Sequence, residues 1–280
     1  MKKISRRSFL AASGLTIAAL ALTACGGSAS TASSAASSVA ASSEAASTSA
    51  AAAELTTVEA GKLTMATNAA FPPYEMTTDA GAFEGIDIDT AQAIADKLGL
   101  ELQIDDMDFD AALLSVQQGK ADIVMAGVTV TDERKNVMDF SDSYATGIQS
   151  IIVPEGSDIA SPDDLAGKKI GTQRGTTGYI YCSDDFGDDA VVAYDNGLTA
   201  VQALNNGQVD AVVIDNAPAQ EFVAANPGLV ILDTSYAEED YAIGMAKGNT
   251  ALEDAVNAAL EELKADGTLQ SIVDKYITAE

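Results

Sequence analysis

The strongest constraint on the fold is a regular alternation of strand-like and helix-like segments along residues 63–277. Short apolar runs typical of buried strands alternate with amphipathic stretches typical of helices, which is the pattern of an α/β protein. The expected strands cover residues 63–67, 100–105, 122–126, 148–153, 169–172, 191–194, 210–214, 230–232 and 241–246. The expected helices cover residues 88–98, 111–118, 176–181, 198–205, 217–225, 251–265 and 269–277. We therefore expect sheets flanked by helices.

Two segments of the chain resemble each other and indicate two lobes. Residues 115–124 read SVQQGKADIV and residues 203–212 read ALNNGQVDAV, so each contains a helix end, a glycine and a strand that opens with Asp. Aligning Gly119 with Gly207 places Gly127 opposite Asp215, both at the carboxyl end of a buried strand. Open α/β sheets bind ligands at that end, so two facing lobes would bring both residues to one ligand. A chance likeness between two common helix-strand units remains an alternative.

The segment MAGVTVTDER, residues 125–134, carries groups suited to a zwitterion. Thr131 and the acids after it are typical of a helix start, which places Arg134 near the beginning of that helix. A guanidinium can hold a carboxylate by two parallel hydrogen bonds, while the Gly127 carbonyl and the Thr129 hydroxyl can accept from an ammonium. Free amino acids carry both groups. Arg134 as an ordinary solvated helix residue is the competing interpretation.

A second anion site is expected where Gly175, Thr176 and Thr177 open a helix after the strand at residues 169–172. The Thr176 and Thr177 amides can point at an anion with the helix dipole behind them. Such a sequence is an ordinary helix cap more often than a site. With Arg134 in the other lobe, it could hold the same carboxylate from the opposite side.

The N-terminal residues predict an exported lipoprotein. Residues 1–24 hold a basic start, a short apolar run and then Leu22, Thr23 and Ala24 before Cys25, which is an export signal with a lipoprotein cleavage box. We expect residues 1–24 to be the signal peptide and Cys25 the site of lipid attachment. Residues 5–10 also match the twin-arginine pattern, so both export routes remain open. Residues 25–56 are rich in Ser and Ala, which predicts a flexible tether.

The charge and the scarce residue types exclude several kinds of function. The chain has a net charge of −27, and removal of residues 1–24, with four basic residues and no acid, changes it to −31. Such a surface repels nucleic acid. The sequence contains no histidine, so we expect no metal site and no cofactor. Cys182 is the only cysteine besides Cys25, and it is expected to be a core residue rather than a reactive thiol.

Several motifs resemble the polar amino acid solute-binding proteins of ABC importers, the group with glutamine-, histidine- and lysine/arginine/ornithine-binding members. The likeness spans residues 63–277 and is most specific in TNAAFPPYE (67–75), GIDIDTAQAIADKLG (85–99), MDFDAALLSVQQGKADIVMAGVTVTDER (107–134), DFSDSY (139–144), GTT (175–177) and residues 210–215. It implies a two-lobed periplasmic-binding-protein-like fold of type II, with a sheet flanked by helices in each lobe and a two-strand hinge. The implied lobe 1 is residues 57–146 and 243–280, and lobe 2 is residues 147–242.

The resemblance also implies the site residues and their roles. Arg134 and the Thr177 amide would hold the α-carboxylate, and Gly127, Thr129 and Asp215 the α-ammonium. Phe71 and Phe109 would lie on either side of the ligand side chain, although both rings could equally be core residues. The implied ligand-binding set is Asn68, Phe71, Phe109, Gly127, Thr129, Arg134, Gln173, Thr176, Thr177 and Asp215.

Four positions depart from the pattern of the family, and three of them leave the substrate open. Thr90 replaces an aliphatic residue on a helix, outside the site. Asn68 stands where several relatives have an acid, Gln173 where glutamine-binding relatives have lysine, and Ile214 where those relatives have histidine. We expect a polar, uncharged amino acid such as cystine or glutamine, with a basic amino acid as the alternative.

The expected protein is a binder rather than an enzyme. Its partners would be an amino acid, the permease and ATPase of an ABC importer, and the membrane through the lipid, with no nucleic acid, and a monomer is expected. It would be anchored at the outer face of the cell membrane, on the periplasmic side if the cell is Gram-negative. A dehydratase-like enzyme and a sensor ectodomain are the competing functions. The absence of histidine argues against the enzyme, and the absence of a signalling segment after the second lobe, before Glu280, argues against the sensor.

Overall fold

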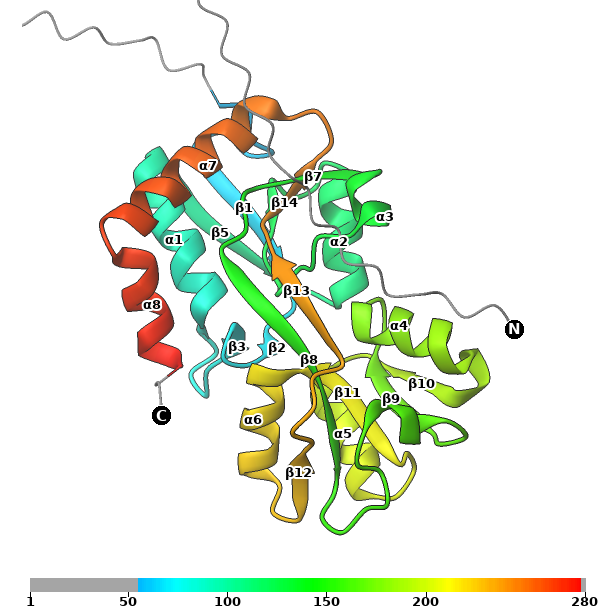
Figure 1. The fold of residues 1–280 in the computed structure, drawn as a ribbon. Coiled ribbons are helices and arrows are strands. Elements are labelled where there is room, and N and C mark those ends of the chain that lie inside the picture. The colour runs from blue at the N-terminus through cyan, green and yellow to red at the C-terminus, as the bar shows by residue number, and fades with distance from the viewer. Residues whose placement is uncertain (1–54, 278–280) are drawn as a thin grey trace, which may run out of the picture. The chain divides into compact units, whose positions relative to one another are not determined.

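A computed structural model describes residues 55–277, which form two main sheets, one small sheet and the surrounding helices (Figure 1). The strand order is β5-β1-β6-β14-β7 in the first sheet, β10-β9-β11-β8-β12 in the second, with β13 paired to β8, and β2-β3-β4 in the small sheet. The strands are β1 Lys62–Thr67, β2 Ala70–Phe71, β3 Glu75–Thr77, β4 Phe83–Glu84, β5 Glu101–Asp106, β6 Ile123–Val124, β7 Met138–Phe140, β8 Ala145–Pro154, β9 Ile170–Gln173, β10 Val191–Tyr194, β11 Ala211–Asp215, β12 Leu229–Ile231, β13 Ala237–Tyr241 and β14 Gly244–Ala246. The helices are α1 Ile86–Leu98, α2 Phe109–Gln117, α3 Asp132–Lys135, α4 Thr177–Phe186, α5 Gly197–Asn205, α6 Asn216–Ala225, α7 Thr250–Ala265 and α8 Thr268–Tyr276, with 3-10 turns at Pro162–Leu165 and Asp188–Ala190.

The first sheet is assembled from two distant parts of the chain. Its strands β1, β5 and β6 are parallel to one another, whereas β14 lies between β6 and β7 and is antiparallel to both. Residues 62–140 therefore need residues 244–246 to complete their sheet.

The second sheet uses one continuous stretch, residues 145–241. The chain enters it through β8 and leaves it through β13, and these two strands pair antiparallel from Ala145 with Tyr241 to Gln149 with Ala237. They lie side by side as the long green and orange strands of Figure 1. The α/β fold class with two lobes and a two-strand hinge is confirmed, while the residue boundaries of the lobes remain a prediction.

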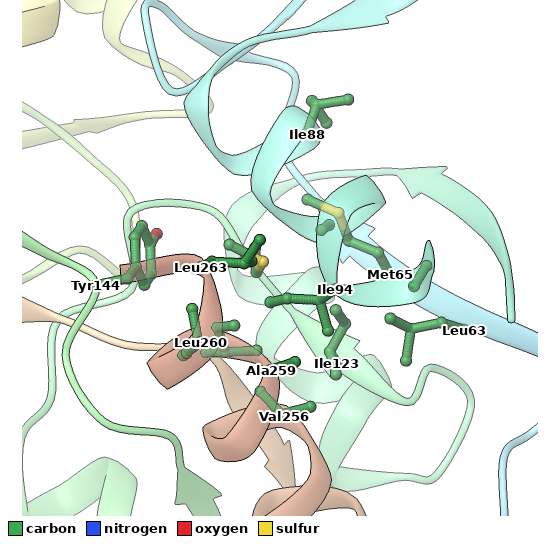
Figure 2. Close-up of a cluster of buried hydrophobic side chains, with 14 of the residues drawn as sticks. Leu63, Met65, Ile88, Ile94, Ile123, Tyr144, Val256, Ala259, Leu260 and Leu263 are labelled. Atoms are coloured by element: carbon green, nitrogen blue, oxygen red, sulfur yellow. The ribbon is translucent and has the colours of Figure 1, made fainter. Parts of the chain in front are cut away.

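Both faces of each main sheet are covered by apolar side chains. Along β1, Leu63 and Met65 belong to one buried cluster and Ala66 to another, as the period of two in a strand requires. Figure 2 shows the first of these clusters, in which Leu63 and Met65 lie near Ile94 of α1, and Leu260 of α7 belongs to the same cluster. Along β11, alternate residues likewise belong to two clusters. These layers fix the carboxyl ends of the central strands, where the predicted site residues lie.

The two similar segments have the same local structure. Gly119 and Gly207 both have positive φ, 65° and 66°, and each follows a helix. Asp122 accepts a hydrogen bond from the Thr64 amide at 2.8 Å, and Asp210 accepts one from the Lys169 amide at the same distance. In both lobes the Asp thus joins its own strand to the start of the neighbouring parallel strand.

Some expected elements are corrected by the structure. Residues 241–246 are not one strand, because Tyr241 ends β13 in the second sheet and Gly244 begins β14 in the first. The strand expected at residues 122–126 is shortened to Ile123–Val124. The sequence patterns did not predict β2, β3, β4 and β7, which have two or three residues each and are too short to show a periodicity.

Cys182 is fully buried in α4 as a free cysteine, and burial raises the pKa of its thiol to about 12, which confirms a core role. Among residues 55–277, no helix combines the length and the apolar character that a membrane crossing requires. The predicted signal peptide, the lipid-attachment residue Cys25 and nearly all of the tether lie outside the described residues.

Candidate functional site

A cavity of about 440 Å³, a volume that includes the open solvent at its mouth, lies between the two sheets. It collects residues from β2, β3, β8, β9, β11 and β13, from the starts of α2, α3 and α4, and from the segments that follow β1 and β6. All ten residues predicted from the sequence line this one cavity: Asn68, Phe71, Phe109, Gly127, Thr129, Arg134, Gln173, Thr176, Thr177 and Asp215. Their roles toward a ligand stay predictions.

Gly127 occupies a position that only glycine fits. It follows β6 with φ at 54°, and a Cβ there would lie 2.9 Å from Cε1 of Phe71. The Gly127 amide donates to Oδ2 of Asp87 at 3.0 Å, which fixes the orientation of this peptide. The close approach lets the Phe71 ring pack against the backbone at the cavity wall.

Arg134 is held as a buried cation at the start of α3. The Thr131 hydroxyl accepts from the Arg134 amide at 3.2 Å, which is the expected helix cap. The guanidinium donates to the Thr129 carbonyl at 2.7 Å and to the Gly175 carbonyl of the other lobe at 3.1 Å. Its carbon lies 5.5 Å from the centre of the Phe109 ring. Burial lowers the pKa of Arg134, but a guanidinium remains charged in proteins, and three of its five N–H donors stay free of these two bonds.

The start of α4 presents backbone amides to the cavity. The Thr176 hydroxyl accepts from the Tyr179 amide at 3.3 Å and caps the helix. Thr177 is the first residue of α4, so its amide has no carbonyl partner within the helix. This amide and the guanidinium of Arg134 therefore reach the same cavity from different lobes.

Asp215 is the buried acid of the second lobe. Its Oδ2 accepts from the Tyr241 hydroxyl at 2.7 Å and from the Ile148 amide at 2.8 Å, and its Oδ1 caps α6 by accepting from the Ala217 amide at 3.2 Å. Burial is the main cause that raises the pKa of Asp215 to about 6, so the carboxylate is charged at neutral pH. These three hydrogen bonds fix the position of the carboxylate, and they leave part of its capacity to accept hydrogen bonds unused.

Two neutral amides meet across the lobes. The Asn68 side chain donates to the Met107 carbonyl at 2.8 Å, and its Oδ1 accepts from Nε2 of Gln173 at 2.9 Å. Both residues are buried. The side chains that the family resemblance assigns to substrate selection thus touch each other in the structure.

The sequence did not predict several residues around the cavity. Besides Ile214, which the family resemblance had singled out, the lining includes Glu75, Ala126, Gln149, Val213 and Tyr241. Glu75 is fully buried on the short strand β3, and burial followed by the charge of Asp87 raises its pKa well above the ordinary value. Burial therefore favours the neutral form of this carboxyl group, and neither of its oxygens has a hydrogen-bond partner among the described residues. A signal was present, since an acid within the apolar run FPPYEM needs a buried partner.

The arrangement matches the two ends of a zwitterion. Arg134 supplies a buried cation from the first lobe, and Asp215 supplies a buried anion from the second. Gly127 and Thr129, which offer a backbone carbonyl and a hydroxyl as acceptors, line the same cavity. A buried charge is stable when an opposite charge pairs with it, so a ligand with both charges would compensate both residues at once.

Residues 63–279 match the family of bacterial extracellular solute-binding proteins, family 3. The chain is 33% identical over 276 residues to a probable histidine-binding protein of Neisseria gonorrhoeae, covering 96% of this chain and 95% of the relative. It is also 33% identical over 226 residues to the L-cystine-binding protein TcyJ of Escherichia coli K12, covering 79% and 85%.

A solved structure of an ancestral arginine-binding protein bound to glutamine is 42% identical, with a TM-score of 0.75, and the match covers 79% of this chain and all of that one. These relatives are solute-binding proteins rather than enzymes. The chain belongs to the bacterial extracellular solute-binding proteins of family 3, within the amino-acid-binding group of ABC importers that its sequence resembles.

Proposed function

We propose that this protein captures one free amino acid in the cavity and delivers it to an ABC importer. The α-carboxylate binds the guanidinium of Arg134 and the Thr177 amide, and the α-ammonium binds the Gly127 carbonyl, the Thr129 hydroxyl and Asp215. The observation that carries the proposal is the pair of opposite buried charges, Arg134 and Asp215, which line one cavity from two lobes.

In this proposal, ligand contacts to both lobes favour the closed form. The lobes are residues 57–146 with 243–280, and residues 147–242, joined by β8 and β13. A ligand shifts the equilibrium between open and closed forms only by its differential affinity for them, and a ligand that contacts Arg134 in one lobe and Asp215 in the other has such a difference. The permease then distinguishes the occupied protein by its shape.

The proposed anchor is a lipid on Cys25, which holds the protein at the outer face of the membrane. The Ser/Ala tether of residues 26–56 separates that anchor from the lobes. This arrangement keeps the cavity near the permease without restricting closure.

The test of the function is Arg134→Ala, with Arg174→Ala as its matched control. Arg174 follows strand β9 directly, and its side chain is 53% exposed and pairs with Asp195 on the surface. We expect Arg134→Ala to weaken amino acid binding by about 2 to 5 kcal/mol, because the buried carboxylate loses its charge partner. Calorimetry should show unchanged affinity for Arg174→Ala. Wild-type affinity in Arg134→Ala would refute the site.

The proposed substrate is an amino acid with a polar, uncharged side chain, such as glutamine or cystine. Support comes from Asn68 and Gln173, because the two amides that meet across the lobes carry no charge that would compensate a cationic side chain.

A basic amino acid is the second candidate, because relatives of this chain are named for histidine and arginine. Titrations with glutamine, cystine, histidine, lysine and arginine decide between the candidates. Tenfold tighter binding of arginine or lysine than of any neutral amino acid would refute the first. Asn68→Asp should shift the preference toward arginine and lysine, and an unchanged preference would remove position 68 from the side-chain contacts.

A further inference from the structure

Glu239 lies beside the cavity and belongs to none of the groups assigned so far. It sits on the hinge strand β13, where three acids follow one another at positions 238, 239 and 240. The strand alternates its faces, so Glu238 and Asp240 are exposed, whereas Glu239 is 6% exposed and points inward like Tyr241. Burying an acid on a hinge strand costs free energy unless hydrogen bonds or opposite charges compensate the loss of its hydration.

Three side chains from separate elements donate to one oxygen of Glu239. Its Oε2 accepts from the Thr129 hydroxyl, from the Thr177 hydroxyl and from Nε2 of Gln149, each at 3.0 Å. Thr129 belongs to the first lobe, while Thr177 and Gln149 belong to α4 and β8. The convergence of three donors on one oxygen fits an ionised carboxylate. Its other oxygen, Oε1, is buried with no hydrogen-bond partner among the described residues.

These bonds decide what the two hydroxyls can offer to a ligand. A threonine hydroxyl has a single proton, and Thr129 and Thr177 both give theirs to Glu239. Their oxygens lie 3.4 Å apart and both residues line the cavity, so the lone pairs that remain form a double acceptor. A double acceptor backed by a negative charge suits an ammonium and disfavours a second carboxylate.

We propose that Glu239 is a positioning residue that makes Thr129 and Thr177 acceptors for the α-ammonium and joins the two lobes behind it. The inference rests on the proposed function and deepens it, because it explains how the cavity distinguishes the ammonium end of an amino acid from its carboxylate end. Asp215 supplies the direct charge partner, and Glu239 acts through the two hydroxyls.

The experiment compares two ligands that differ only at the α-position. Wild-type mature protein is titrated with glutamine, arginine, histidine and cystine, and the tightest binder is paired with its analogue in which a hydroxyl replaces the α-ammonium. In Glu239→Gln, we expect the amino acid to bind about tenfold more weakly, the scale of one lost hydrogen bond to a charged group, while the hydroxy analogue changes by less than about threefold. Glu238→Gln, an exposed neighbour on the same strand, should change neither ligand.

An equal loss for both ligands in Glu239→Gln would overturn the inference, because a merely structural residue does not discriminate between them. A second readout is the double variant Glu239→Gln with Thr129→Val. If Glu239 acts through that hydroxyl, Thr129→Val should cost clearly less in the variant than in the wild type, and additive losses would contradict the inference.

Should Glu239→Gln fail to fold, Glu239→Asp takes its place, because the shorter side chain withdraws the carboxylate from the two hydroxyls and the same loss of discrimination is expected. If the wild-type protein binds none of the four amino acids, the proposed function fails and the role of Glu239 fails with it. Binding by the wild type with undiminished discrimination in both variants would overturn the role of Glu239 alone.

Discussion

We expect ligand binding to depend on pH through the proposed role of Asp215, and the direction of the effect follows from the burial of this residue. In the ligand-free protein its pKa is raised to about 6, from an ordinary value of 3.8. An ammonium binds only the carboxylate and lowers that pKa, so affinity should be full above pH 6. It should fall by about tenfold per pH unit below pH 6, since one proton must then be released on binding. Calorimetry between pH 5 and pH 8 measures this slope.

The control for the pH response is Asp215→Asn, which should bind weakly and without that slope. Asp87 is the other candidate, because burial raises its pKa to about 6 as well, and it accepts from the Gly127 amide. A slope that persists in Asp215→Asn would assign the titration to Asp87.

At the residue scale, the sequence was informative where a site residue follows a strand or opens a helix. Gly127, Arg134, Thr177 and Asp215 could be found because strand ends and helix caps have recognisable patterns. Glu239 could not be found in this way, because it is one of three consecutive acids. Only the register between β13 and β8 decides which of the three points inward.

The hinge strand β8 carries a glycine that the cavity requires. A Cβ at Gly147 would lie 2.5 Å from Cζ of Tyr241 and 2.7 Å from Oδ2 of Asp215. We therefore expect Gly147→Ala to push the Tyr241 hydroxyl away from Asp215, and to lower the free energy of unfolding by about 1 to 3 kcal/mol. Thermal unfolding and ligand titration measure the two effects.

Thr146→Ala is the matched control on β8, because Thr146 is the exposed neighbour of Gly147. It should leave both stability and affinity near wild type. If Gly147→Ala is as stable as the wild type, β8 and β13 can move apart slightly without lowering the free energy of unfolding, which would contradict the prediction.

At the scale of the elements, the sequence predicted the boundaries of long helices and strands better than those of short ones. The helix at residues 250–265 and the strand at residues 62–67 have enough turns or alternations to show a period. The apolar run at residues 241–246 also shows a strand-like period, but the chain passes from the second sheet to the first between Tyr241 and Gly244. Pairing with β8 and then with β6 is a long-range choice that no local pattern records.

At the scale of the whole molecule, anchoring and binding should be separable. We expect Cys25→Ser to move the protein from the membrane fraction to the soluble fraction, because the lipid has no attachment site. Ligand affinity should stay unchanged, since residues 26–56 separate the anchor from the lobes. Cell fractionation and titration of the released protein measure both effects.

Ser28→Ala, a substitution three residues after Cys25, is the control and should leave the protein in the membrane fraction. Membrane attachment of Cys25→Ser after washing with salt would mean that another part of the protein holds it there.

The position of β14 between β6 and β7 also sets the order in which the molecule can be completed during synthesis. The sheet that ends in Asp215 needs only residues 145–241, whereas the sheet that carries Gly127 and Arg134 lacks a central strand until residues 244–246 have emerged. Contacts between such distant residues form late, because a long loop must close first. A nascent chain can thus finish its second lobe before its first, and the walls of the cavity are complete only after residues 244–246 have emerged.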